Sequence, residues 1–264
     1  MTFLTLTPET LPDSHICCAM SDRRYAAGTE AKKRWLAETH AQGYRFSRLD
    51  ERGKVLIEYG PGAEAWQPVV APDWMVMGCF WVSGRFKQQG HGKALLGTAL
   101  EAARGAGLAG LVAVVGRRKL PFLSDGAWLR RQGFHEVDAT DSGFSLLALG
   151  HEGAAAAPAP RFADSARRGL PAGTQGLTVF YSDRCPFTEF HIGTALRETC
   201  AKRGLSPTIV KLDSREKAQN APSPATIFSL FAGDRFVTND LSVCLDHRFD
   251  AILARAGVDP APGL

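Results

Sequence analysis

Several segments of the chain have the apolar patterns of β-strands. Residues 44–49 and 54–59 are rich in aromatic and aliphatic side chains, and the turn-forming residues 50–53 between them predict an antiparallel hairpin. Residues 74–82 form an apolar run that predicts a third strand. A second continuous run, residues 110–115, suits a strand buried on both faces of a sheet. These segments predict a sheet with antiparallel strands and a buried central strand.

Helical spacing appears between and after these strands. Residues 12–20 predict a short helix capped by Asp13 or Ser14, and residues 29–42 predict a longer one that Gly43 ends. Ser124 is the predicted cap of a further helix that ends before Gly133-Phe134. Another helix begins after two glycines and has its apolar face at Leu95, Leu96, Ala99, Leu100 and Ala103.

Three more predicted strands complete the first part of the chain, at residues 3–7, 135–138 and 144–149. The order is then strand, helices, three antiparallel strands, helix, strand, helix and two strands. We expect a mixed α/β sheet with helices packed against it.

An Ala/Pro/Gly-rich stretch divides the chain, which predicts a first domain at residues 1–150, a linker at 151–175 and a smaller α/β domain at 176–264. In the second domain the pattern predicts a strand at 177–181 and then a helix that runs to about residue 203. Further strands are predicted at 207–212, 227–231 and 235–238, with a last helix at 243–256.

Composition narrows the functional classes. The 264 residues are 45% hydrophobic and 22% charged with a net charge of +4, which is ordinary for a globular protein and gives no reason to expect a nucleic-acid surface. We expect no signal peptide, no membrane span and a cytoplasmic location with reduced thiols. The cysteines lack a paired Cys-x-x-Cys spacing, so no metal is expected; they are residues 17, 18, 79, 185, 200 and 244.

The most informative stretch is the glycine loop, residues 83–93, which joins the apolar strand 74–82 to the helix beyond it. Gly90 and Gly92 open that helix, so backbone N–H groups and the positive end of the helix dipole meet with little side-chain obstruction. The spacing is neither that of a P-loop nor that of a dinucleotide fingerprint. The loop is suited to hold a phosphate or pyrophosphate.

The segment Lys87-Gln-Gln-Gly-His-Gly92 resembles the acyl-CoA loop of the GNAT acetyltransferases, with Lys where Arg or Gln is usual. Further similarity at residues 15–20, 57–61, 64–66, 79–84 and 122–125 resembles the YoaP-like branch of that superfamily. The resemblance implies transfer of an acetyl group from acetyl-CoA to a small-molecule amine, directly and in a ternary complex. It implies that cofactor is bound by Phe80, Trp81, Val82, Lys87, Gln88, Gln89, Gly90, His91, Gly92 and Lys93.

Candidate catalytic groups are Glu58 and Glu64, either of which could accept the amine proton, whereas His91 is better suited to contact the cofactor. For the segment around Glu64, a purely structural role in packing the loop is as good an explanation as a role in an acceptor pocket. Many GNAT enzymes have a tyrosine that protonates the leaving thiolate, and Leu129 stands at the matching position here. The resemblance suggests substrate contacts at Cys18, Trp66 and Ser124.

The second domain resembles the thioredoxin fold of the YoaP type. Cys185-Pro-Phe-Thr188 stands where that fold carries its active cysteines, and Pro224 lies near the position of its cis-proline. Cys185 is a candidate reactive thiol, since a helix N-terminus and Arg184 both favour a thiolate. A thiol-binding or redox protein with an acyl-CoA-sensing first domain is therefore the alternative function. The other interpretation is that the second domain serves only for binding, because Thr188 replaces the resolving cysteine. The sequence does not determine the oligomeric state.

Overall fold

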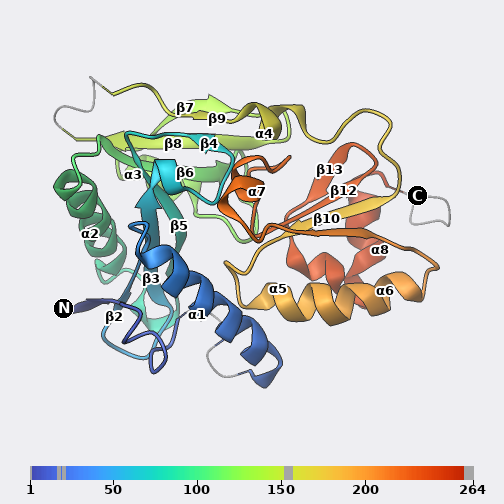
Figure 1. The fold of residues 1–264 in the computed structure, drawn as a ribbon, viewed down its shortest axis with the longest axis horizontal. Helices are drawn as coiled ribbons and strands as arrows, with labels where there is room; N and C mark the ends of the chain where they lie inside the picture. Colours follow the sequence, from blue (N-terminus) through green and yellow to red (C-terminus); the bar gives the residue numbers. More distant parts are fainter. Residues whose placement is uncertain (1, 17–18, 20–21, 152–156, 259–264) are drawn as a thin grey trace. The chain divides into compact units, whose positions relative to one another are not determined.

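The computed structural model describes residues 2–16, 19, 22–151 and 157–258. The chain divides into two compact units, and each is described by itself. The first unit comprises residues 1–20, 33–65 and 69–163, and the second comprises residues 21–32, 66–68 and 164–264. Both units are mixed α/β folds (Figure 1).

The first unit is built on a seven-stranded mixed sheet with the strand order β1-β2-β3-β5-β6-β8-β7. Neighbouring strands are antiparallel, except that β5 and β6 run parallel. The strands are β1 (Phe3–Thr5), β2 (Arg45–Leu49), β3 (Val55–Pro61), β5 (Met75–Val82), β6 (Gly110–Gly116), β7 (His135–Ala139) and β8 (Phe144–Gly150).

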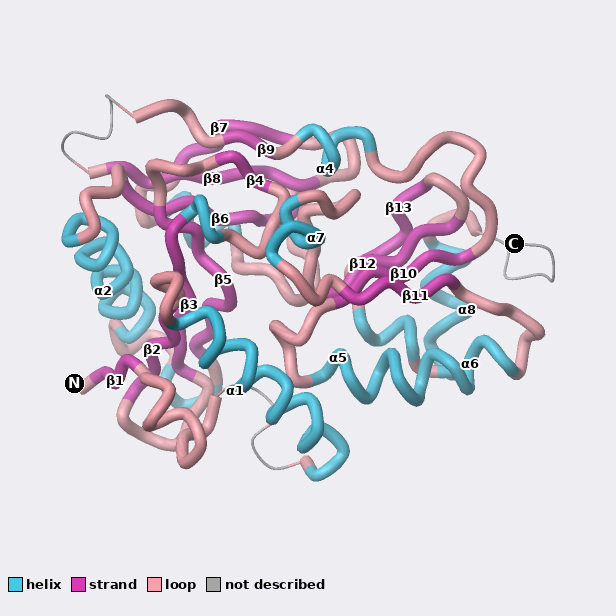
Figure 2. The backbone as a smooth tube through the Cα atoms, in the orientation of Figure 1, coloured by secondary structure: helices cyan, strands magenta, loops and turns pink. Residues whose placement is uncertain are grey.

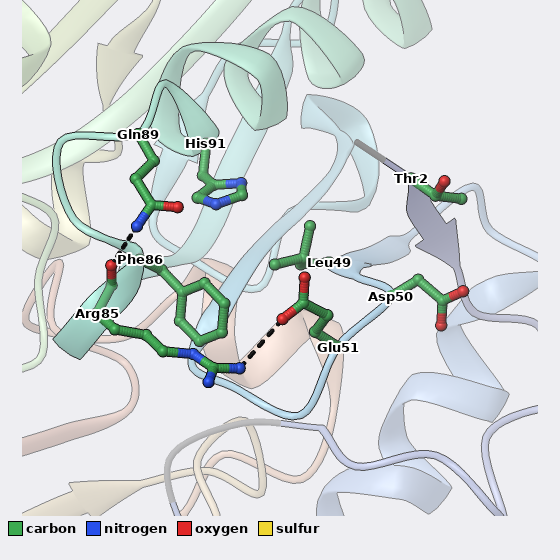
Figure 3. Close-up of a pocket in the computed structure, with 8 residues that line it drawn as sticks. All are labelled: Thr2, Leu49, Asp50, Glu51, Arg85, Phe86, Gln89 and His91. Carbon is green, nitrogen blue, oxygen red and sulfur yellow. Dashed lines mark hydrogen bonds and ion pairs between the residues drawn. The ribbon is translucent and has the colours of Figure 1, made fainter.

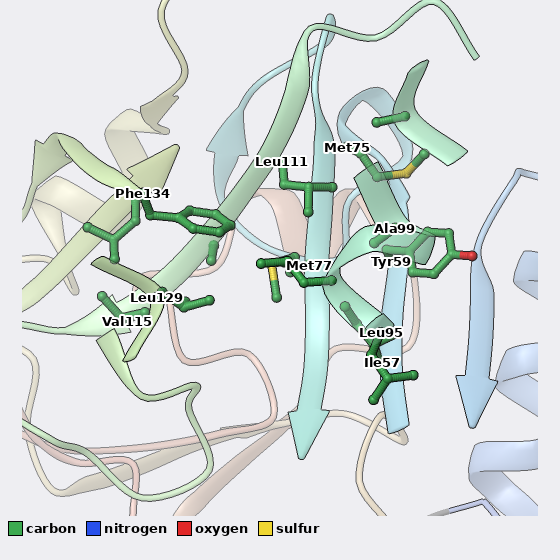
Figure 4. Packing of buried hydrophobic residues seen from close by; sticks show 14 of the residues in the cluster. Ile57, Tyr59, Met75, Met77, Leu95, Ala99, Leu111, Val115, Leu129 and Phe134 are labelled. Atoms are coloured by element: carbon green, nitrogen blue, oxygen red, sulfur yellow. The ribbon is translucent and has the colours of Figure 1, made fainter. Parts of the chain in front are cut away.

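One face of this sheet is covered by α2 (His91–Gly105) and α3 (Gly126–Arg131). Because side chains alternate along a strand, one set of alternate residues on β3 and β5 meets the apolar face of α2. Figure 4 shows this packing, in which Ile57, Met77 and Leu95 are fully buried. The predicted apolar face of the helix after the glycine loop is confirmed at Leu95, Leu96, Ala99 and Ala103.

The other face of the sheet carries Tyr44, which precedes β2. Its ring packs edge-on against Trp35 of α1 (Ala26–His40), with 4.7 Å between ring centroids. A Cβ added to Gly60 would lie 2.5 Å from the Tyr44 ring, and one added to Gly78 would lie 2.2 Å from its hydroxyl. Two glycines on neighbouring strands therefore leave the space that this tyrosine occupies.

The segment that follows β8 still belongs to the first unit. β9 (Arg161–Phe162) pairs antiparallel with β4 (Val69–Val70), and the backbone N–H of Phe162 donates to Asp138 Oδ2 at 2.7 Å. Phe162 is fully buried. α4 (Asp164–Arg168) then begins the last part of the second unit. The predicted linker 151–175 therefore contains a strand and a short helix, and its boundaries stay a prediction.

The second unit has a four-stranded sheet in the order β11-β10-β12-β13, where β10 and β11 are parallel and the other pairs antiparallel. In Figure 2 the helices α5, α6 and α8 lie on one side of this sheet, and their apolar residues pack on Val179 and Leu230. The resemblance of this unit to the thioredoxin fold stays a prediction. None of the described peptide bonds is cis, including the one that precedes Pro224. The strands are β10 (Leu177–Tyr181), β11 (Thr208–Lys211), β12 (Phe228–Ala232) and β13 (Arg235–Thr238). The helices are α5 (Phe187–Phe190), a π-helical turn (His191–Leu196), α6 (Arg197–Ala201), α7 (Arg215–Gln219), the 3-10 turn η6 (Leu241–Cys244) and α8 (Asp246–Arg255).

Several local expectations need correction. The described part of residues 12–20 contains turns, a bend and irregular backbone but no helix, and α7 was not predicted. Asp125, not Ser124, caps α3, since its carboxylate accepts the Trp128 N–H at 3.0 Å. The carboxylate of Asp125 is one residue closer to the helix, where it can reach that N–H. Among the described residues, no helix combines the length and apolar composition needed to cross a bilayer.

Candidate active site

β5 and β6 share only a short ladder. Met75 pairs with Leu111 and Val76 with Val112, although β5 continues to Val82 and β6 to Gly116. Beyond these pairs the two strands share no further ladder pairs, and we call the interval between them the opening. An extended ligand that enters this opening could take main-chain hydrogen bonds from the β5 edge that faces β6.

A β-bulge interrupts β5 within this opening. Ile57 lies opposite Phe80 and Tyr59 opposite Met77, so Glu58 alone faces the two residues Gly78 and Cys79. Such a bulge leaves a backbone group outside the ladder and redirects the side chains that follow it. The opening between the strands therefore contains backbone dipoles at the level of a carboxylate.

That carboxylate, Glu58, is fully buried and accepts a hydrogen bond from the Tyr44 hydroxyl at 3.1 Å. A Cβ added to Gly78 would lie 3.1 Å from the same carboxylate oxygen, Oε2, so Glu58 lies directly against the bulge. The structure thus places one of the two predicted bases beside the bulged backbone. Sequence reasoning missed Tyr44, because its contacts with Glu58 and Gly78 join different strands of the sheet.

The glycine loop follows β5 and reaches α2 through residues in the left-handed region, Gly84 (φ 62°), Gln88 (φ 61°) and Gly90 (φ 82°). Gly90 is the N-cap of α2 and gives no side-chain capping bond, and the Ala94 N–H donates to the Gly90 carbonyl at 3.1 Å. The N–H groups of residues 91–93 precede that first helical bond. Lys87 and Lys93 are exposed beside them, so this helix start is suited to an anion.

Gly92 lies under two aromatic rings. The rings of Phe80 and Trp128 are 5.2 Å apart, and a Cβ added to Gly92 would be 3.1 Å from the Trp128 ring. Leu129 is fully buried in the core of the sheet, so its side chain offers nothing polar to a ligand. Trp128 is the α3 side chain that faces the glycine loop. Of the other predicted strand contacts, Val82 is partly buried, whereas Trp81 is 44% exposed.

A pocket of about 490 Å³ lies beside the start of α2 (Figure 3). Phe86, Gln89 and His91 line it from the loop side. The His91 ring lies edge-on to Phe86 at 5.7 Å, and its Nδ1 is buried without a hydrogen-bond partner. An exposed ion pair of 3.1 Å between Arg85 and Glu51 lies at the same pocket. The structure therefore places His91 among aromatic rings next to the loop.

The other residues predicted to serve the first domain lie on separate segments of the chain. Glu64 is half-buried at the end of the 3-10 turn η2 (Gly62–Glu64), and Ser124 is half-buried before α3. Trp66 belongs to the second unit, where it packs on a small apolar cluster formed by Leu212, Ala218 and Ala221. Cys18 lies outside the described residues.

Cys185 occupies a buried position. Its side chain is 9% exposed and belongs to the main apolar cluster of the second unit, and its reactivity as a thiol stays a prediction. The Arg184 side chain is buried as well and donates to the Thr226 hydroxyl at 2.8 Å and to the Trp66 carbonyl at 3.0 Å. The alternative function, a thiol-binding or redox protein that works through Cys185, stays a prediction.

Comparison with known proteins finds matching family models and a relative that is similar over most of the chain. Residues 11–119 match the model described as "Acetyltransferase (GNAT) family", and residues 208–250 match the one described as "YoaP-like". The chain is 39% identical over 241 residues to the "Uncharacterized N-acetyltransferase YoaP" of Bacillus subtilis (strain 168). That similarity covers 91% of this chain and 94% of the Bacillus protein.

Solved structures similar to the chain include other acetyltransferases. A putative acetyltransferase of the GNAT family from Desulfovibrio desulfuricans is 15% identical, with a TM-score of 0.41 over 56% of this chain and 98% of its own. The PaiA N-acetyltransferase of Thermoplasma acidophilum, in complex with coenzyme A, is 14% identical, with a TM-score of 0.39 over 57% of this chain and 100% of its own.

Proposed function

This chain belongs to the YoaP family of N-acetyltransferases, with a GNAT acetyltransferase domain and a YoaP-like C-terminal part, and from that premise we propose that it transfers the acetyl group of acetyl-CoA directly to a small-molecule amine. The donor and the acceptor are bound together in a ternary complex. The observation that carries the proposal is the opening between β5 and β6, which contains the bulge at Gly78 and Cys79 beside the Glu58 carboxylate.

Acetyl-CoA is held at two places. Its pyrophosphate lies at the start of α2, where the N–H groups of residues 91–93 and the charges of Lys87 and Lys93 favour an anion. The pantetheine arm follows the β5 edge that faces β6 at residues 80–82 and takes main-chain hydrogen bonds there. The thioester then reaches the bulge at Gly78 and Cys79.

The reaction moves one acetyl group and one proton. A backbone N–H at the bulge donates to the thioester oxygen and stabilises the negative charge that develops on it. The amine nitrogen attacks the carbonyl carbon and forms the new C–N bond, and Glu58 accepts the proton that the nitrogen loses, directly or through a water. The C–S bond then breaks, and its electron pair leaves on the CoA sulfur, which solvent protonates.

Tyr44 is a positioning residue in this scheme. Its hydroxyl donates to Glu58 Oε2, so it holds the carboxylate in one orientation against the bulge. Glu64 is the second candidate base, and the same experiments separate the two.

The experiment is a thiol-release screen of the full chain with acetyl-CoA against amino acids, polyamines, aminoglycosides and thiols. We expect release of CoA that depends on one class of amine, with the acetylated amine identified by mass spectrometry. Glu58→Gln is expected to lower kcat by about 10²- to 10⁴-fold with acetyl-CoA affinity retained, and Glu64→Gln is the matched comparison. Tight acetyl-CoA binding without turnover on any acceptor would contradict the proposal, and a loss only in Glu64→Gln would move the base to that residue.

A further inference from the structure

The region around Cys185 in the second unit is not an open surface. The second unit includes residues 21–32, and its described part, residues 22–32, contains the 3-10 turn η1 (Arg23–Tyr25) and the first half of α1. We call residues 22–32 the cover segment. It stands far from Cys185 in the sequence and makes direct contact with the residues that follow this cysteine.

The first contact is an aromatic cluster around Tyr25 of the cover segment. Its ring lies edge-on to Phe187, with 4.6 Å between centroids, and edge-on to Phe190 at 5.7 Å. It is also stacked on His191, with the ring planes 2° apart and the centroids separated by 5.9 Å. Such edge-on and stacked ring pairs add to the stabilisation that burial alone provides.

The second contact joins two backbones. A Cβ added to Gly28 in α1 would lie 2.0 Å from the carbonyl oxygen of Pro186, so only glycine permits this approach. Pro186 directly follows Cys185 in the chain. The helix therefore lies against the turn that carries the cysteine, closer than any other residue type would allow.

The polar groups beside Cys185 are engaged within the second unit. The Thr188 hydroxyl donates to the carbonyls of Ser182 at 2.9 Å and Cys185 at 2.7 Å. The Arg184 guanidinium donates to Thr226. Thr188, at the position where a resolving cysteine would stand, is thus part of the internal hydrogen bonding of the turn.

We infer that the Cys185–Pro186 turn, with the rings of Phe187, Phe190 and His191, is a docking surface for an aromatic helical segment, that the cover segment of the same chain occupies it, and that this docking shields the Cys185 thiol. The second unit then uses this surface to hold the start of α1, and thiol exchange is blocked while the segment is docked. The inference concerns the second unit and does not depend on the identity of the acetyl acceptor.

Pulse alkylation of the folded full chain with N-ethylmaleimide, resolved for each cysteine by peptide mass spectrometry, tests this inference. In the wild type we expect Cys185 to react at least tenfold more slowly than Cys79, which is partly exposed. Cys200 and Cys244 report on unfolding of the whole unit, because both are buried and burial raises the pKa of Cys200 to about 11 and that of Cys244 further.

Gly28→Ala and Gly193→Ala form a matched pair. Both glycines lie in helices of the second unit, but a Cβ at Gly193 meets nothing within 4 Å. Alanine favours helix over glycine, so Gly193→Ala should raise the melting temperature and leave labelling unchanged. Gly28→Ala should lower the melting temperature and speed Cys185 labelling at least tenfold, while Cys200 and Cys244 stay protected.

Two results would overturn the inference. One is labelling of Cys185 in the wild type as fast as that of Cys79. The other is a Gly28→Ala protein in which Cys185 stays protected and the melting temperature rises as it does in Gly193→Ala. If Gly28→Ala exposes Cys200 and Cys244 as well, the test is the labelling rate of Cys185 in Tyr25→Ala. That variant removes the ring contacts without a backbone clash. Faster labelling of Cys185 alone then supports the inference, and continued protection refutes it.

Discussion

At the scale of single residues, Tyr44 shows how small neighbours create room for a buried polar contact. Its ring and hydroxyl occupy the space above Gly60 and Gly78, and its hydroxyl reaches Glu58. A hydrogen bond to a charged group contributes about 1.5–3 kcal/mol. The pair is therefore strong enough for its loss to be measured both in activity and in stability.

Tyr44→Phe is expected to lower kcat for acetyl transfer roughly tenfold, or about 1.4 kcal/mol, and to leave acetyl-CoA affinity unchanged. The reason is that the carboxylate loses its orientation while the donor site stays intact. The matched control is Tyr59→Phe, since Tyr59 is also buried but packs on the opposite, α2 side of the sheet. Equal kcat in the two variants would contradict the positioning role.

Gly78→Ala is expected to destabilise the protein by about 1–3 kcal/mol, because the added methyl would lie 2.2 Å from the Tyr44 hydroxyl. Removing that hydroxyl makes room, so the double variant Gly78→Ala with Tyr44→Phe should recover part of the loss. Urea denaturation measures the free energy of unfolding of Gly78→Ala, of Tyr44→Phe and of the double variant. Gly97→Ala serves as the control, since a Cβ there meets nothing within 4 Å. Additive effects in the double variant would show that the clash is not with the hydroxyl.

At the scale of elements, the positions of the inward-facing apolar residues of β5 reflect its bulge. Met75 and Met77 face α2, and after the bulge Phe80 and Val82 face it, so the alternation shifts by one residue. The shift is visible in the sequence once the inward face is known. The sequence alone does not identify that face, because the whole run from residue 74 to residue 82 is apolar apart from Gly78.

The start of α2 gives a prediction for donor binding. Lys93→Gln removes an exposed positive charge in the first turn, and we expect acetyl-CoA affinity to fall about 1.7-fold to fivefold, from the 0.3–1 kcal/mol typical of charges at helix ends. Arg104→Gln makes a comparable change in the last turn of the same helix and should leave affinity unchanged. Calorimetry at low and at high salt measures the acetyl-CoA affinity of both variants. The loss of affinity in Lys93→Gln should shrink as salt screens the charge. Equal losses in both variants would argue against a pyrophosphate at this helix start.

At the scale of the whole molecule, the first unit extends beyond the predicted end at residue 150. Phe162 is fully buried, and the Trp74 indole donates to the Pro158 carbonyl at 2.9 Å. We expect residues 1–163 to unfold at a higher temperature than residues 1–150, because the shorter fragment loses a buried aromatic worth about 3 kcal/mol. Thermal unfolding with and without acetyl-CoA compares the two fragments with the full chain. Equal melting temperatures would mean that the β4–β9 ladder adds nothing to the first unit.

Much of the architecture could be predicted because it depends on short-range patterns. The order of strands and helices, the apolar face of α2, the glycine loop and the presence of a second α/β part follow from side-chain periodicity and from residues adjacent in the chain. The boundaries of the units could not be predicted in the same way. Residues 66–68 join the second unit because the Trp66 carbonyl accepts from Arg184 and Thr226, which stand more than a hundred positions away.

The family resemblance, the glycine loop proposed to hold acetyl-CoA and the pair of candidate bases follow from the sequence alone, since each depends on residue type and local spacing. Three features become visible only in the folded chain: Glu58 lies against the bulge, Tyr44 donates a hydrogen bond to it, and Cys185 is buried next to the residue that Gly28 contacts, Pro186. These features arise where strands diverge, where a register shifts and where two backbones touch. All three are set by pairings between residues distant in the chain, which local periodicity does not encode.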